Sequence, residues 1–159
     1  RQIPFHSEQF IMVFDRSQLA QLPPAATTDL GPALHQQFID LHELSFPKTY
    51  YSGPEIIARL SAEQRVLVVA EGEKLLGYTY IEAKPEFGEG HIEFIAVDQE
   101  ARGRGVGLTL LTSALGWLFS FASVSAIELV VDGTNPTARS LYQRAGFTTR
   151  YEMVNFRQG

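Results

Sequence analysis

Cysteine is absent from the sequence, and this absence excludes disulfide bonds, thiolate metal sites and a cysteine nucleophile. Histidine is scarce as well, with only His6, His35, His42 and His91. None of the four stands in a metal-ligand motif, and the nearest pair is seven residues apart. We therefore predict no bound metal.

Basic residues are fewer than acidic residues. Lysine and arginine number 13 against 18 aspartate and glutamate residues, which gives a net charge of −5. Because nucleic-acid-binding domains carry a concentrated basic surface, we expect no nucleic-acid partner.

Residues 105–127 contain no charged side chain, and about 20 apolar residues suffice to span a bilayer. Glycine, serine and threonine recur through this stretch, however, so a buried helix explains it better than a membrane span. No secretory signal is visible at the start, and we expect a cytoplasmic protein without a membrane partner. The chain begins with Arg1 rather than methionine, which leaves open whether it was trimmed or belongs to a longer parent chain.

The first third of the chain predicts one strand and two helices. Residues 10–14 form a short apolar run typical of a strand. A helix is predicted over residues 32–46, and a second, shorter one over residues 54–60. The inward face of the first helix is predicted to carry Leu34, Phe38, Leu41 and Leu44.

The rest of the chain predicts an antiparallel meander followed by alternating helices and strands. Three strands are expected at residues 65–71, 75–82 and 91–97, joined by glycine-containing turns. Apolar residues then recur at helical spacing on two faces from about 105 to 122, which predicts a helix buried on both sides. A strand at 128–131, a helix at 136–145 and a strand at 148–156 complete the pattern.

This order of elements predicts an α+β domain with a mixed, mostly antiparallel central sheet flanked by about four helices. We place the domain at residues 29–159. Residues 1–28 are predicted to be a strand and a linker-like segment, which is either part of the domain or a join to a preceding region.

A glycine-rich loop, Arg-Gly-Arg-Gly-Val-Gly at residues 102–107, separates the meander from the long helix. A helix N-terminus presents unpaired N–H groups and the positive end of the helix dipole, and glycines let the backbone approach a ligand closely. The loop is therefore predicted to bind an anion such as a pyrophosphate, although it also fits a structural turn that caps a buried helix. It lacks the Gly-Lys-Ser/Thr ending of a Walker loop, and no βαβ unit precedes it.

Two motifs resemble the GCN5-related N-acetyltransferase (GNAT) family. Residues 102–107 match the family signature Gln/Arg-x-x-Gly-x-Gly/Ala that follows its fourth strand, and the preceding Ile95-Ala96-Val97-Asp98 is similar to the end of that strand. Residues 135–147 match the motif Asn-x-x-Ala-x-x-Leu-Tyr-x-x-x-Gly-Phe at every fixed position. The resemblance covers about residues 29–156 and implies the GNAT fold.

The resemblance implies acetyl-CoA as the acyl donor, with its diphosphate on the loop backbone and its pantetheine arm along the splayed fourth strand. An N–H near Val97 would polarise the thioester carbonyl. Asn135 would hydrogen-bond the pantetheine, although it also fits a plain helix cap. Tyr142 would act as the general acid that protonates the leaving thiolate, or would simply pack against the sheet. The implied donor-binding residues are Ile95, Ala96, Val97, Arg102, Gly103, Arg104, Gly105, Val106, Gly107, Asn135 and Tyr142.

At the amine end, Glu93 resembles the position where many family members carry a base carboxylate, although a solvated strand residue is the plain alternative. His91 and Glu82 are weaker candidates for the base. The first helix–loop–helix of the family shapes the acceptor pocket, and the resemblance therefore implies that the acceptor meets Phe46, Tyr50 and Tyr51.

These features together imply an acetyl-CoA-dependent N-acetyltransferase in which a primary amine attacks the donor directly in a ternary complex. The alternative is an acyl-CoA-binding module that no longer catalyses or that is one half of a tandem pair. A structural domain with an empty cleft is a third and weaker hypothesis. The acceptor is expected to be a small molecule or a peptide, and a homodimer remains open.

Overall fold

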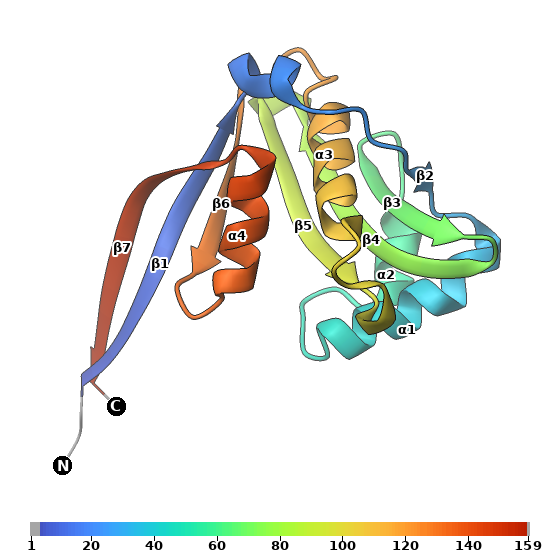
Figure 1. Cartoon of the computed structure of the whole chain (residues 1–159), viewed down its shortest axis with the longest axis horizontal. Helices are drawn as coiled ribbons and strands as arrows, with labels where there is room; N and C mark the ends of the chain where they lie inside the picture. Colours follow the sequence, from blue (N-terminus) through green and yellow to red (C-terminus); the bar gives the residue numbers. More distant parts are fainter. Residues whose placement is uncertain (1–3, 159) are drawn as a thin grey trace.

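The computed structural model describes the backbone of residues 4–158 and the side chains of residues 9–150. The predicted order of strands and helices is confirmed, and the fold class is α+β (Figure 1). In chain order the elements, with η for a short 3₁₀ helix, are β1 (Pro4–Asp15), η1 (Arg16–Gln21), β2 (Thr28–Asp29), η2 (Pro32–Leu34), α1 (His35–Ser45), α2 (Gly53–Arg59), β3 (Gln64–Glu71), β4 (Lys74–Lys84), η3 (Pro85–Phe87), β5 (Glu89–Val97), η4 (Gln99–Ala101), α3 (Val106–Leu118), β6 (Ala126–Asp132), α4 (Pro136–Ala145) and β7 (Thr148–Gln158).

The strands form two antiparallel sheets (Figure 1). One sheet has the order β2-β3-β4-β5 and the other has the order β6-β1-β7. β5 and β6 face each other across the junction and diverge toward their C-terminal ends, where β5 leads to α3 and β6 leads to α4 (Figure 1). The edge of β5 that faces this opening is therefore unpaired among the described strands.

β1 extends beyond the predicted strand and forms the centre of the second sheet, between β6 and β7. Its side chains Phe10, Met12 and Phe14 are buried and pack in one cluster with α3 and β6. The division of the chain at residue 29 stays a prediction, while β1 shares a hydrophobic core with the elements that follow.

α3 packs against β4, β5 and α4, and it is buried on both faces as its sequence predicts. The helix is shorter than predicted, because it ends at Leu118. Just beyond this end, the guanidinium of Arg16 donates hydrogen bonds of 2.7 to 3.0 Å to the carbonyl oxygens of Phe119, Phe121 and Val124. These carbonyls lie in the turn that follows the helix and need donors from outside it. Among the described residues, no helix is long and apolar enough to cross a membrane.

The prediction that Leu44 points inward is wrong, because 79% of its surface is exposed. Each residue of an α-helix advances by about 100°, which places position 44 about 120° away from the buried Phe38. On that face of α1 the inward position is occupied by His42, which is completely buried, as is Phe38, beside the largely buried Leu41.

Candidate functional site

The glycine-rich loop forms two tight turns before α3 begins. Gly103 and Gly105 have φ angles of +80° and +81°, a left-handed conformation that costs other residues roughly 1 kcal/mol or more. Gly105 is the N-cap residue of α3, and no side chain caps the first helical turn. The N–H groups at the start of this 13-residue helix are thus left for an external acceptor.

The main cleft, of about 760 Å³, opens between this loop, β5 and α4, at the end of the molecule where β5 and β6 diverge (Figure 1). Its volume falls in the range of small-molecule sites. All but one of the predicted donor-binding residues line it, and these are Ile95, Ala96, Val97, Arg102, Gly103, Gly105, Val106, Gly107, Asn135 and Tyr142. The tertiary structure therefore brings together two motifs that lie some thirty residues apart in the sequence.

Arg104 is the exception, because it does not line the cleft. Its guanidinium forms an ion pair with Glu71 at the end of β3. Arg102 does line the cleft and donates from Nε to the carbonyl oxygen of Val97 at 3.4 Å. A second cation at the cleft comes from Arg144 in the last turn of α4. Arg144 was not among the predicted donor-binding residues because it occupies a variable position of the second motif, although a basic residue in a motif next to an anion site is a usable signal.

Residues 95–97 of β5 form one wall of the main cleft. β4 pairs with them on one side, with Thr79 opposite Ile95 and Gly77 opposite Val97. Their other edge faces the opening between the two sheets. Unpaired strand edges accept an extended ligand as an additional strand, so this wall suits a chain of amide groups.

α4 supplies the two polar side chains of the second motif. Asn135 caps the helix, since its Oδ1 accepts from the N–H of Ala138 at 3.1 Å. The plain capping role is thus present, and the residue also lines the cleft. Tyr142 packs edge-on against Phe147, with ring centroids 5.6 Å apart. Its hydroxyl makes no hydrogen bond with any described residue, and burial raises its pKa above the usual value, so the proton stays on the oxygen at neutral pH.

Glu93 lies at an irregularity in the β4–β5 ladder. Tyr80 pairs with Phe94 and Ile81 pairs with Ile92, which leaves Glu93 as an extra residue on β5. Such a bulge changes the direction of a side chain. The carboxylate of Glu93 here accepts a hydrogen bond from the hydroxyl of Tyr50, at 2.5 Å.

The predicted acceptor residues gather around Phe94. The rings of Phe46 and Tyr50 lie 5.0 and 5.4 Å from it, and the ring of Tyr51 lies 4.8 Å from that of Tyr50. Phe46 also lines the main cleft. An aromatic cluster thus connects the cleft with the carboxylate of Glu93.

The two weaker candidates for a base are held in other contacts. Glu82 is almost fully buried and accepts from Arg59 at 3.2 Å and from Gln64 at 2.6 Å. His91 pairs with Glu89 at 3.1 Å. Among the described residues, no group of three or more histidine, aspartate or glutamate side chains is placed to hold a metal ion.

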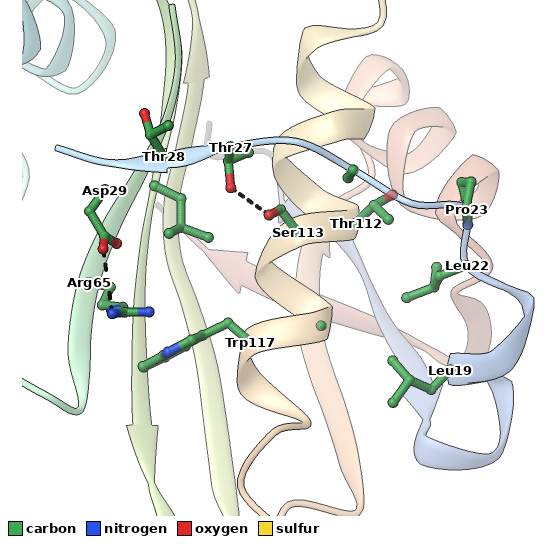
Figure 2. Close-up of a pocket in the computed structure, with 13 residues that line it drawn as sticks. Leu19, Leu22, Pro23, Thr27, Thr28, Asp29, Arg65, Thr112, Ser113 and Trp117 are labelled. Atoms are coloured by element: carbon green, nitrogen blue, oxygen red, sulfur yellow. Dashed lines mark hydrogen bonds and ion pairs between the residues drawn. The ribbon is translucent and has the colours of Figure 1, made fainter.

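A second hollow, of about 620 Å³, lies on the outer face of α3, beneath the segment that connects η1 to β2 (Figure 2). The hydroxyls of Thr27 and Ser113 meet across it at 2.6 Å, and Arg65 pairs with Asp29 at 3.4 Å on its other side. No residue of either motif lines this hollow, so the main cleft is the better candidate for the functional site.

Two curated relatives are named as acetyltransferases. One, from Methanocaldococcus jannaschii, is named an uncharacterized N-acetyltransferase and is 35% identical over 104 residues, which cover 65% of each chain. Another is the mycothiol acetyltransferase of Tsukamurella paurometabola, 28% identical over 166 residues, or 89% of this chain and 56% of the relative. The chain thus spans less than two thirds of the length of these relatives.

Among solved structures, a GCN5-related N-acetyltransferase from Sphaerobacter thermophilus superposes with a TM-score of 0.71. It is 21% identical, and the match covers 99% of this chain and 53% of that one. At this identity the likeness concerns the fold. The family model described as the acetyltransferase (GNAT) family matches residues 35–147, a range that contains both motifs and Glu93, and the chain belongs to that family.

Proposed function

We propose that this protein transfers an acetyl group from acetyl-CoA to a primary amine, by direct attack in a ternary complex. The observation that carries the proposal is the continuity of the site. One cleft holds the glycine loop, the open edge of β5 and Tyr142, and Phe46 connects it to the pair formed by Tyr50 and Glu93.

The donor fits the loop end of this cleft. Its diphosphate would accept hydrogen bonds from the N–H groups at the start of α3, beside the guanidinium groups of Arg102 and Arg144. Its pantetheine amides would pair with the open edge of residues 95–97. This arrangement would bring the thioester next to Val97, where a backbone N–H would stabilise the negative charge that develops on the carbonyl oxygen.

The acid and the base of the reaction would stand on opposite sides of the thioester. Tyr142 would donate its proton to the departing thiolate; a thiol has a pKa of about 8.5 and a tyrosine one of about 10, so this transfer needs little driving force. Glu93 would accept the proton that the amine loses. Freeing a lysine-like amine at pH 7 costs about 4–5 kcal/mol, which is why such an acceptor needs a base nearby.

The acceptor end is suited to a cation. Glu93 has a tyrosine rather than a basic side chain as its hydrogen-bond partner, and aromatic rings surround it. A carboxylate among aromatic rings attracts an ammonium group. The names of the relatives as acetyltransferases support acetyl as the group transferred. The choice between a small-molecule and a peptide amine, a cytoplasmic location and a homodimer stay predictions from the sequence.

The experiment combines calorimetry with a turnover assay. Binding of CoA is measured first, and thiol release from acetyl-CoA is then followed with a panel of amines: a polyamine, an aminoglycoside, an amino acid and a peptide with a free N-terminus. We expect CoA binding and amine-dependent thiol release, with the acetylated amine identified by mass spectrometry. Binding without turnover on any amine would favour the non-catalytic module. Failure to bind CoA would refute the assignment of the cleft.

A further inference from the structure

The hydrogen bond between Tyr50 and Glu93 is an unusual contact for an exposed loop residue. Tyr50 belongs to the segment between α1 and α2, and 63% of its surface is exposed. Its hydroxyl nevertheless reaches across to β5 and donates to Oε2 of Glu93 at 2.5 Å. Although most of the side chain is exposed, partial desolvation of the hydroxyl and the adjacent carboxylate of Glu93 both raise the pKa of Tyr50 above its usual value, so the hydroxyl keeps its proton and remains a donor.

This contact restrains a side chain that would otherwise rotate freely. A glutamate side chain loses rotamer entropy when it is held in one conformation, so a hydrogen bond that holds it beforehand reduces what the reaction has to supply. The hydroxyl of Tyr50 contacts only one oxygen of Glu93, which leaves Oε1 available to the amine. The ring of Tyr50 is in turn held against Phe94 and Tyr51.

A buried histidine, His42, makes a hydrogen bond to the backbone of the loop that carries Tyr50. His42 on α1 is completely buried, and its Nε2 lies 2.7 Å from the carbonyl oxygen of Tyr51. Since a carbonyl oxygen only accepts, Nε2 carries the proton. In the neutral ring Nδ1 is then an acceptor, and the hydroxyl of Tyr78 on β4 donates to it at 2.5 Å.

Tyr78 can fill this role because burial raises its pKa and keeps its hydroxyl protonated. It is completely buried, and it packs edge-on against Phe38 of α1 with ring centroids 4.7 Å apart. A chain of two hydrogen bonds thus runs from β4, an inner strand of the four-stranded sheet, through His42 to the backbone next to Tyr50. The sequence pattern marked His42 only as one of four ordinary histidines.

We propose that Tyr50 is a positioning residue that aims the carboxylate of Glu93 at the acceptor amine, and that His42, held by Tyr78, sets the loop in the conformation that this requires. The inference rests on the proposed function, because it assigns Glu93 a partner in that reaction. It follows that the hydroxyl of Tyr50 acts only through Glu93, and that removing this hydroxyl should not change the affinity for the donor.

A double-mutant cycle tests the first half. Tyr50→Phe removes only the hydroxyl and is expected to lower kcat about tenfold, with the affinity for CoA unchanged. Glu93→Gln is expected to lower kcat further, and the double variant should be no slower than Glu93→Gln alone, because the two groups act as one unit. Additive losses would overturn the inference. Glu86→Gln, a carboxylate-to-amide change at an exposed position on η3, is the matched control.

Conservative replacement tests the second half. In His42→Gln the side-chain amide nitrogen can still donate to the carbonyl oxygen of Tyr51. The leucine of His42→Leu has no donor and loses this hydrogen bond. We expect His42→Gln to retain most of the wild-type kcat and His42→Leu to behave like Tyr50→Phe. Equal losses in both folded variants would overturn the role of His42. Tyr78→Phe, which keeps the ring, provides a second route to the same conclusion if His42→Leu does not fold.

A spectroscopic measurement separates this inference from the proposed function. With ¹³C-labelled tyrosine, the chemical shift of Cζ of Tyr50 at neutral pH is compared by NMR in the wild type, in Glu93→Gln and in His42→Leu. We expect this resonance to shift in both variants, because Glu93→Gln replaces the charged acceptor of the Tyr50 hydroxyl and His42→Leu removes the hydrogen bond to the loop. Such shifts in a protein that acetylates no amine would refute the proposed function and support the contact. An unchanged resonance in both variants of an active enzyme would refute the positioning role alone.

Discussion

Replacing Tyr142 by phenylalanine tests the chemistry with the least disturbance of the fold. The ring remains packed against Phe147, and the lost hydroxyl makes no hydrogen bond with a described residue. Burial of that hydroxyl, which raises its pKa, is unfavourable for folding, so the free energy of unfolding should stay within about 0.5 kcal/mol of wild type or rise slightly. The change thus isolates the proton that Tyr142 would give to the thiolate.

The expected loss is large and concerns the rate. A positioned general acid contributes about 10²–10⁴-fold, which corresponds to about 2.7–5.4 kcal/mol of barrier. The affinity for CoA should be unaffected, because the remaining lining of the cleft is unchanged. A general acid must be protonated to act, and the pKa of Tyr142 is raised. Tyr142 should therefore stay protonated up to about pH 10, and its ionisation should not lower the wild-type rate below that pH.

The assay is thiol release from acetyl-CoA with the best amine of the panel, at saturating donor, for the wild type and Tyr142→Phe. Calorimetry with CoA and thermal unfolding of both proteins control for binding and folding. Turnover within twofold of wild type, with unchanged CoA affinity, would show that a group other than Tyr142 protonates the leaving thiolate. The assignment of Tyr142 as the acid would then be abandoned.

Four further predictions concern other parts of the structure. A Cβ on Gly116 would meet no atom within 4 Å, so Gly116→Ala in the interior of α3 should stabilise the protein by about 1 kcal/mol, and a lower denaturation midpoint in urea would contradict this. Arg102→Gln should weaken CoA binding about three- to tenfold, while Arg104→Gln, whose side chain points to Glu71, should change it less than twofold; equal effects in calorimetry would show that both contact the donor. Arg16→Met should lower the free energy of unfolding by about 2–4 kcal/mol, because several carbonyls lose a charged donor, and a loss below 0.5 kcal/mol would show that water replaces it. The pKa of Asp132 is lowered by hydrogen bonds from Thr134, so its contribution is present above about pH 4 and is lost as the pH falls further; acid unfolding of Asp132→Asn should show a shallower dependence on pH, and an identical curve would contradict the effect.

Several features of the site were predictable because they depend on neighbours along the chain. The turns at Gly103 and Gly105 need a backbone that tolerates positive φ. The start of α4 follows from Asn135, which caps it, and its end follows from Gly146, which adopts a φ of +111°. Each of these positions is decided within a few residues, so composition and spacing are sufficient to find it.

Other predictions failed because periodicity does not show what an element packs against. The apolar pattern could not show that the long helix ends at Leu118, or that Arg16, about a hundred residues earlier in the chain, donates to carbonyl oxygens of the turn that follows it. It placed Leu44 inside, where His42 lies. It also could not show that the guanidinium of Arg104 pairs with Glu71 of β3, while the donor-binding role that the resemblance implies for the loop backbone stays a prediction.

The fold family and the glycine-loop end of the cleft could be predicted from the sequence, because both follow from local conformation: strand and helix periods, caps, and glycines that allow a turn. The surroundings of the proposed acceptor end depend instead on contacts between distant parts of the chain. Tyr50 and Glu93 are 43 residues apart and meet because one extra residue in β5 redirects a carboxylate and because a buried histidine holds a loop. Such contacts depend on strand register and on the packing of α1 against the sheet, which arise only when the whole chain has folded.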